Sequence, residues 1–435
     1  SKVDSLLRSR GDLNGQIDSH LKRSEAIRQK EDELRKAKDV YLHDMEEMAR
    51  RCYSYYENFY MSHQRDSAAH YLQLRAKLDT ANVLWQSEAG GVVMRYLSDY
   101  ELAGDYYERA LDAAICQNGE SHPEVAMAYN NIGMLSQIQG DNDKALEYFN
   151  LSLKIRRNVY GDSHPDVGRS YNNIGTVYHY KGDYAGALDS YQRSLEILSS
   201  EYGDSDPSVA TLYNNIGEVL YAQRDYSGAF EAHMMALDIR REGFGDIYPD
   251  VGASFNNIGS VYYAQGDYVK ALEYLNLSLN IRRQTLGSSH PDIADTYSNI
   301  GSVYQAQGDY SDAMEYYNQS LEIMKRVHGD SHPSIATLYN NIGMLYFNQG
   351  DYANAVEYQK LSLEIREQLF GNSHQDVMVS NMSLGLAYLA MGEVRNGLSY
   401  LKKACELAQR LLGPEDQIAK GLMEQIEILE NMLKE

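Results

Sequence analysis

The sequence predicts an all-α protein, an α-solenoid in which antiparallel helix pairs stack one after another. A Gly-Asp turn or a near variant recurs every 42 residues, at 98–99, 140–141, 182–183, 224–225, 266–267, 308–309, 350–351 and 392–393. A glycine keeps the same period from Gly119 to Gly413, and a proline does so from Pro123 to Pro333. A fixed spacing of this length is typical of repeat architectures, in which each unit buries its apolar face against its neighbours.

The unit at residues 163–203 shows why each repeat should fold as two helices. Ser163-His164-Pro165-Asp166 has the residue types of a helix start, and we expect Ser163 to cap it. Large and small side chains then recur at helical spacing up to the Gly182-Asp183 turn and again up to Gly203, which ends the second helix. Arginines near the end of the second helix in other units, such as Arg156 and Arg157, suit its negative pole.

Seven positions of this unit carry a family resemblance: Tyr171, Ile174, Gly175, Tyr178, Ala187, Tyr191 and Ser194. They resemble the signature of the tetratricopeptide repeat (TPR), and the 42-residue unit with a Gly-x-x-His-Pro-Asp linker resembles the kinesin light chain and nephrocystin-3-like kind. The resemblance implies a right-handed superhelix over residues 81–414, whose first helices line a concave groove. Departures occur at Arg224, at Gln375 and at Asn381-Met382-Ser383, where the usual Tyr-Asn-Asn is lost.

The two ends of the chain lack the 42-residue period. Residues 1–80 predict an N-terminal helical segment with a loose start at Gly11 and Gly15, and residues 415–435 predict a capping helix. Apolar residues spaced seven apart at 27, 34, 41 and 48 indicate a partial coiled coil, through which the chain would oligomerise. The alternative is an amphipathic helix that packs on the first repeat.

The candidate binding site is the concave groove. The TPR resemblance directs these residues toward it: Asn130, Asn172, Asn214, Asn256, Asn299, Asn340, Arg169, His179, Tyr221, Tyr263 and Phe347. Side-chain amides both donate and accept, so an asparagine ladder would hold a peptide backbone without reading its side chains. The alternative, which we favour for the second asparagine of each pair, is a bond to helix A of the next repeat that only holds the stack. For the aromatic residues, the alternative to binding a peptide is ordinary packing within the superhelix.

The charges of the expected groove and of the whole chain restrict the kind of partner that can bind. The expected groove has Arg169 and His179 as its basic residues and Glu218 and Asp295 as its acidic ones, and no cluster of lysines and arginines recurs there. The groove should therefore prefer a neutral or basic segment of a protein partner. A formal net charge of −22 argues against nucleic acid, and the absence of an apolar run of about 20 residues argues against membrane insertion.

No constellation of catalytic residues is present, so we expect no enzyme activity and no cofactor. The sequence has no phosphate-binding glycine loop and no nucleophile elbow. The linker histidines are too far apart to share a metal and should be cap or packing residues: His122, His164, His290, His332 and His374. The three cysteines match no zinc or disulfide pattern, which makes a cytoplasmic setting the default.

We therefore expect a non-catalytic scaffold or adaptor that binds a peptide or helix of a partner in its groove. One alternative is a structural subunit of a large assembly, for example on microtubules or in cilia, which would use its convex face and ends. A second alternative is the sensor arm of a larger signalling protein.

Overall fold

The computed structural model describes residues 2–61 and 64–433, and its helices form two compact units that divide between Leu97 and Ser98. The described residues form nineteen α-helices that pack in sequential pairs, which confirms the predicted all-α solenoid. No helix within these residues combines the length and apolarity needed to cross a bilayer.

The first unit begins with one long helix, α1 (Lys2–Met61), followed by α2 (Arg65–Leu78), α3 (Val83–Val92) and a π-helical turn (Val93–Leu97). The expected loose start is wrong, because α1 runs through both Gly11 and Gly15. Near its C-terminal end α1 packs on α2 in a small cluster that includes Tyr53 and Leu72. The four apolar residues spaced seven apart are more than half exposed: Ile27, Leu34, Tyr41 and Met48.

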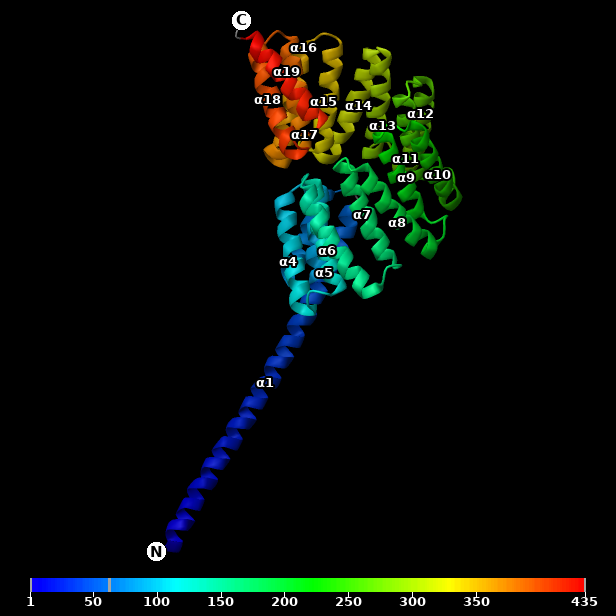
Figure 1. The fold of residues 1–435 in the computed structure, drawn as a ribbon. Coiled ribbons are helices and arrows are strands. Elements are labelled where there is room, and N and C mark those ends of the chain that lie inside the picture. The colour runs from blue at the N-terminus through cyan, green and yellow to red at the C-terminus, as the bar shows by residue number, and fades with distance from the viewer. Residues whose placement is uncertain (1, 62–63, 434–435) are drawn as a thin grey trace. The chain divides into compact units, whose positions relative to one another are not determined.

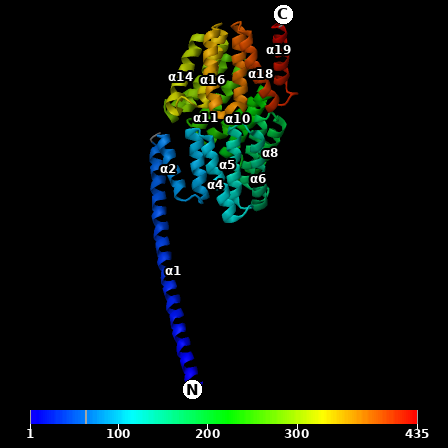
Figure 2. The same cartoon turned by 90° about the vertical axis from the view of Figure 1, so that its left-hand side faces the viewer.

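The second unit begins with α4 (Tyr100–Asn118) and continues as seven regular helix pairs. Within each pair we call the first helix A and the second helix B. The pairs are α5 (Pro123–Ile138) and α6 (Asn142–Tyr160), α7 (Pro165–Tyr180) and α8 (Tyr184–Tyr202), α9 (Pro207–Ala222) and α10 (Tyr226–Phe244), α11 (Pro249–Ala264) and α12 (Tyr268–Leu286), α13 (Pro291–Gln307) and α14 (Tyr310–His328), α15 (Pro333–Asn348) and α16 (Tyr352–Phe370), and α17 (Gln375–Ala390) and α18 (Val394–Leu411). The last helix, α19 (Gln417–Met432), packs on α18 through Ala419 and Leu422. Successive pairs lie side by side along a curve (Figures 1 and 2).

The helix boundaries fall at the periodic residues. The aspartate of each Gly-Asp turn caps helix B, as where the Asp183 carboxylate accepts from the Gly186 amide at 3.0 Å. Helix A is capped by His164 and not by Ser163, so the predicted cap was one residue off; Nδ1 of His164 accepts from the Asp166 amide at 3.1 Å. All five linker histidines named above cap a helix A in this way, which confirms their structural role.

Helices A and B of a pair approach closely at one small residue. A Cβ added to Gly175 would stand 2.8 Å from the ring of Tyr191, which is almost fully buried. One turn further along helix B, the Ser194 hydroxyl donates to the Gly168 carbonyl at 2.8 Å. The small positions of the repeat are therefore required by the contact between the two helices.

Arginines on four of the helices B join the helix to the next helix A. Arg282 donates to the Asp292 carbonyl at 2.6 Å and to the Thr296 hydroxyl at 2.8 Å, and burial lowers its pKa. Arg156, Arg240 and Arg366 make the same two contacts in their own repeats. The sequence analysis assigned arginines here only to the helix pole, so their role as inter-repeat links was missed.

The curve of the second unit brings distant repeats into contact. The rings of Tyr100 and Phe370 lie nearly parallel, with centroids 6.1 Å apart. The His374 ring packs against Gly140, where an added Cβ would stand 2.5 Å from it, and donates to the backbone carbonyl of Ile138. The first helices of the second unit thus contact the turn between α16 and α17, where the sixth pair ends and the seventh begins.

Candidate functional site

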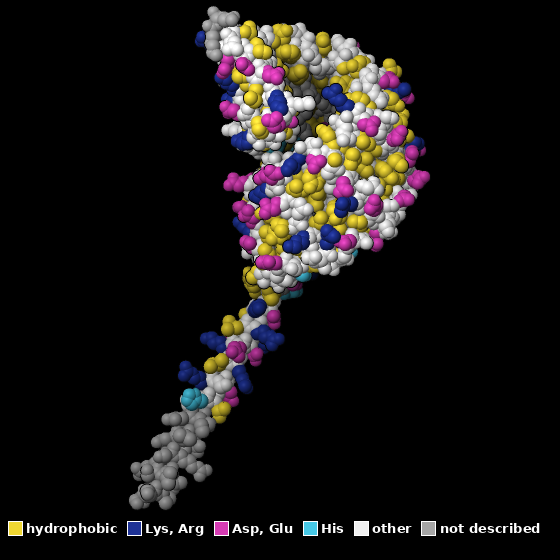
Figure 3. Space-filling model, in the orientation of Figure 1, with side chains coloured by type: hydrophobic (Ala, Val, Ile, Leu, Met, Phe, Trp, Pro, Cys, Tyr) yellow, Lys and Arg dark blue, Asp and Glu magenta, His cyan; other side chains and the backbone are white. Residues whose placement is uncertain are grey.

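Each helix A carries one stripe of side chains that stays outside the core between the two helices. On α7 and α9 the stripe residues are Arg169, Asn172, Thr176 and His179, and Thr211, Asn214, Glu218 and Tyr221. All are half-buried or exposed, whereas Ile174 and Val177 between them are buried. In Figure 1, α7, α9 and α11 lie inside α8, α10 and α12 along the curve. Figure 3 shows that one face of the second unit is hollowed.

Ten of the eleven predicted groove residues lie on these stripes. Asn299 is the exception, because it is the second asparagine of its pair, and Ser298 holds the stripe position on α13. The stripe residues that sequence reasoning placed in the groove are half-buried, apart from Arg169, whose side chain is exposed.

The asparagine pairs form a continuous ladder between helices A. Nδ2 of the second asparagine donates to Oδ1 of the first asparagine in the preceding repeat. The rungs are Asn173 to Asn130 at 2.8 Å, Asn215 to Asn172 at 2.9 Å, Asn257 to Asn214 at 2.6 Å and Asn299 to Asn256 at 3.0 Å. The favoured alternative for the second asparagine placed this bond in the next repeat, whereas it runs to the preceding one. The ladder fixes the spacing between helices A and engages one side of the four stripe amides from Asn130 to Asn256.

The ladder ends at α15. Asn341 donates to the Ser298 hydroxyl at 3.4 Å in a longer rung, and Ser383 stands where the next asparagine donor would be. In the described part of the chain, Oδ1 of Asn340 is buried and has no hydrogen-bond partner. The last stripe amide therefore keeps an unused acceptor.

The aromatic stripe residues each contact the first residue of their own helix B. Ring centroids are 5.6 Å apart for Tyr221 with Tyr226, 6.1 Å for Tyr263 with Tyr268 and 5.3 Å for Phe347 with Tyr352. The ring of His179 contacts Tyr184 in the same way, at 6.1 Å. Packing within the repeat thus covers one side of each ring, and the rings remain only half-buried.

Both stripe carboxylates have a raised pKa, although the Arg282 guanidinium acts in the opposite direction on Asp295. Burial raises the pKa of Glu218, which lies near the phenols of Tyr191 and Tyr221. The pKa of Asp295 is raised to about 6, chiefly by desolvation, although its side chain is open to water. Both facts fit a concave surface, where water reaches the carboxylate but protein surrounds it.

The two basic stripe residues, Arg169 and His179, offer little free positive charge. Arg169 donates two bonds to Asp166, at 2.7 and 3.1 Å, so a carboxylate already neutralises it. Burial lowers the pKa of His179, which favours its uncharged form near neutral pH. The stripes therefore carry negative charge at Glu218 and Asp295, which Arg282 offsets in part at Asp295, and little positive charge in return.

These features define a solenoid repeat protein with an amide-lined inner face, and comparison with known proteins identifies the family. The model of the tetratricopeptide repeat matches residues 79–157, 124–200, 175–242, 250–326, 292–368 and 334–410. The chain therefore belongs to the tetratricopeptide repeat family, whose repeats imply protein–protein interaction and are generally not catalytic.

Solved structures share the fold at low sequence identity. A Rap protein complexed with Competence and Sporulation Factor is 14% identical with a TM-score of 0.56, covering 84% of this chain and 99% of that one. BtubC (BKLC) from P. vanneervenii is 20% identical, with a TM-score of 0.42 and coverage of 55% and 92%. A putative kinesin light chain from Podosopora anserina with nearly identical TPR-like repeats is 22% identical, with a TM-score of 0.39 and coverage of 47% and 97%. A search of curated proteins found no match.

Proposed function

We propose that this chain is a protein-interaction scaffold that binds a segment of a partner protein, rich in neutral and basic residues, along its inner stripes. The observation that carries the proposal is the pair of stripe carboxylates with raised pKa values, Glu218 and Asp295, on stripes whose cations are paired or uncharged. A lysine or arginine of a bound segment would supply the missing positive charge at each carboxylate. The ionised forms would then be stabilised, and their pKa values would fall on binding.

The stripe amides would hold the backbone of the same segment. Because the ladder uses Oδ1 of the first asparagine, Nδ2 is the group left to donate to a peptide carbonyl. The half-buried rings of Tyr221, Tyr263 and Phe347 would provide apolar contacts between repeats. The Rap protein in the comparison is complexed with Competence and Sporulation Factor, which is compatible with ligand binding by a solenoid of this fold.

The test uses three matched peptide pools in which fixed positions hold lysine, glutamine or glutamate. Binding is measured by fluorescence anisotropy for the full chain and for the double variant Glu218→Gln, Asp295→Asn. We expect about a tenfold preference for the lysine pool, lost in this variant, because two pairings of about 0.7 kcal/mol each at partly exposed sites sum to about 1.4 kcal/mol. The control variant, Glu147→Gln with Glu315→Gln, changes two exposed carboxylates of helices B.

The outcomes separate the proposal from its alternatives. Equal binding of the three pools, or an equal loss of the lysine preference in the control variant, would show that the charge of Glu218 and Asp295 does not determine binding. The structural-subunit alternative predicts that groove variants leave assembly unchanged while variants at the convex face and ends break it. Replacing Asn172, Asn214 and Asn256 by alanine is a poor test, because each accepts a ladder bond and the change breaks three rungs.

A second part of the proposal concerns α1. The exposed stripe Ile27, Leu34, Tyr41 and Met48 has seven-residue spacing, which suits a coiled coil with another copy of the chain. Sedimentation velocity of the full chain and of the variant Leu34→Lys, Tyr41→Lys tests it. A dimer lost in the variant is expected, and a monomer in both would leave α1 without this role.

A further inference from the structure

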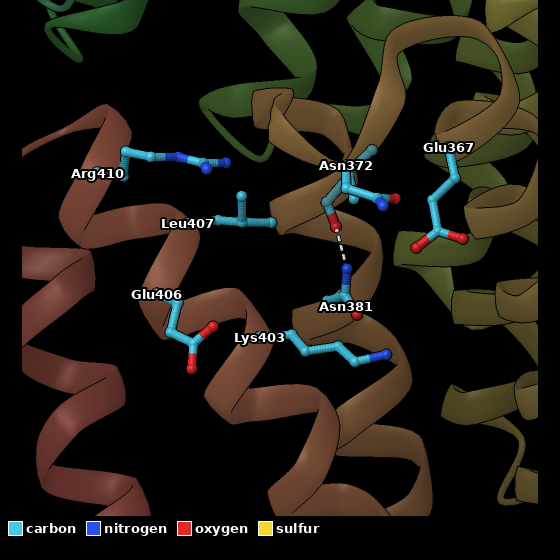
Figure 4. A pocket seen from close by; sticks show the side chains of 8 residues that line it. Glu367, Asn372, Asn381, Lys403, Glu406, Leu407 and Arg410 are labelled. Carbon is cyan, nitrogen blue, oxygen red and sulfur yellow. Dashed lines mark hydrogen bonds between the residues drawn. The ribbon is translucent and has the colours of Figure 1, made fainter.

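A cavity of about 460 Å³ lies between α16, α17 and α18, away from the inner stripes. Its lining residues are Glu367, Asn372, Val377, Asn381, Lys403, Glu406, Leu407 and Arg410. Figure 4 shows the side chains of α18 facing those of α16, α17 and the turn between them. Val377, Asn381 and Leu407 are buried and form the floor, whereas the charged side chains stand at the rim. A volume of this size is in the range that proteins use for binding small groups.

The cavity exists because one repeat lacks a ring that the others have. The position of Asn381 holds an aromatic residue in the six preceding pairs: Tyr129, Tyr171, Tyr213, Phe255, Tyr297 and Tyr339. Cations cover that ring in several repeats, with Arg193 at 5.7 Å from the centroid of Tyr171 and Lys325 at 5.5 Å from that of Tyr339. Counting by 42 residues, Lys403 is the equivalent of Arg193, while the other pairs hold uncharged residues at this position. The Lys403 ammonium lies 5.1 Å from the ring centroid of Tyr400 and also lines the cavity.

Two neighbouring positions change together with the ring. In the preceding repeat Lys325 pairs with Asp330 at 3.3 Å, next to Tyr339. The equivalents in the seventh pair are Glu367 and Asn372. The cation and its carboxylate are thus replaced by a carboxylate and an amide, both of which line the cavity and accept hydrogen bonds.

The floor of the cavity holds an unused acceptor. The Asn381 side chain is 1% exposed, and its Nδ2 donates to the Val377 carbonyl at 2.8 Å (Figure 4). In the described residues its Oδ1 has no hydrogen-bond partner. A buried acceptor of this kind costs free energy until a donor reaches it. An occupant with an O–H group would satisfy it.

The geometry points to this cavity as a second binding site, which receives the tyrosine side chain of a partner polypeptide. The ring would take the place of the missing repeat aromatic under Lys403, between Val377 and Leu407. Its hydroxyl would donate to Oδ1 of Asn381, and the rim carboxylate of Glu367 provides a further acceptor. Phenylalanine would fill the same space but leave Asn381 unsatisfied, so the site distinguishes the two residues.

The test titrates N-acetyl-tyrosinamide into the full chain and follows the methyl NMR signals of Val377 and Leu407. At the binding energy per atom typical of drug-sized ligands, this probe would have a Kd of about 0.3 mM. N-acetyl-phenylalaninamide should bind several-fold more weakly. Asn381→Ala removes the acceptor and should weaken the tyrosine probe about fivefold while leaving the phenylalanine probe within about twofold.

Asn381→Tyr restores the ring found in the six other pairs, so it should fold normally by thermal circular dichroism and bind neither probe. Methyl shifts that stay absent up to about 3 mM probe, roughly ten times the expected Kd, would overturn the inference. Titration that persists in Asn381→Tyr, or equal weakening of both probes by Asn381→Ala, would do the same. Glu218→Gln should leave the titration unchanged, which separates this site from the proposed groove.

Discussion

Completing the asparagine ladder should stabilise the C-terminal repeats. Oδ1 of Asn340 is buried without a partner because Ser383 occupies the place of the next donor. Ser383→Asn would put an amide Nδ2 at the position that donates in four earlier rungs, at 2.6 to 3.0 Å. A satisfied hydrogen bond contributes about 1 kcal/mol, and an unsatisfied buried acceptor costs about 1–3 kcal/mol. We expect a gain of about 1 kcal/mol.

Hydrogen exchange read by mass spectrometry is the suitable assay, because a repeat array opens locally and no single unfolding free energy describes it. A gain of about 1 kcal/mol corresponds to roughly fivefold slower exchange in α15 and α17, with no change in α7. Ser383→Ala is the control and should not slow exchange.

A comparison of two alanine variants gives a second test of the ladder's contribution to stability. Asn214→Ala removes an acceptor that has a donor at 2.6 Å, whereas Asn340→Ala removes one that has none. The first change should accelerate local exchange clearly more than the second. If Ser383→Asn behaves as Ser383→Ala, or if the two alanine variants cost the same, the ladder does not stabilise the stack as argued.

Three further outcomes are expected. Gly175→Ala should lower the local opening free energy of α7 and α8, read by hydrogen exchange, by about 1–3 kcal/mol, because the new methyl would stand 2.8 Å from a buried ring. Gly243→Ala, with open space around it, should be neutral or stabilising in α10. Arg282→Met should lower the stability of its repeat by about 1–3 kcal/mol, because two acceptors lose their donor. The control Arg283→Met changes the exposed neighbour and should lower the stability clearly less. Similar losses in the two variants would contradict this reasoning. Asp295 has a folded pKa raised to about 6, so its ionisation destabilises the fold as pH rises from 3.8 to 6. Affinity for a lysine peptide should instead rise through pH 6, and in anisotropy titrations this rise should be smaller in Asp295→Asn, where only Glu218 still ionises.

The periodic residues made the helix pairs predictable from the sequence. Gly182-Asp183 and Gly203 mark the ends of α8 in the structure because turn and cap residues act locally. The cap at His164 was misplaced by one residue because serine and histidine both offer an acceptor, and only the backbone path decides between them. The 42-residue period by itself predicted the number of regular helix pairs.

Contacts between repeats were harder to predict because they depend on the twist from one pair to the next. The direction of the ladder bonds, from Asn215 back to Asn172, follows from that twist and has no signal in a single unit. The link from Arg282 to Thr296 did have a signal, since both positions recur at the repeat period with a polar partner 14 residues on. The departure at Asn381 was visible in the sequence, but the cavity also depends on Glu367 and Lys403 from two other helices.

The contact of Tyr100 with Phe370 and of His374 with Ile138 gives the second unit mechanical properties that an open coil lacks. An open coil lengthens by small bends shared among all its turns, and its resistance to stretching is low from the start. Here the coil is clasped, so lengthening must first separate two aromatic rings and break a hydrogen bond. Pulling on the ends of this unit should therefore meet an initial stiff step, followed by soft extension once the clasp has opened.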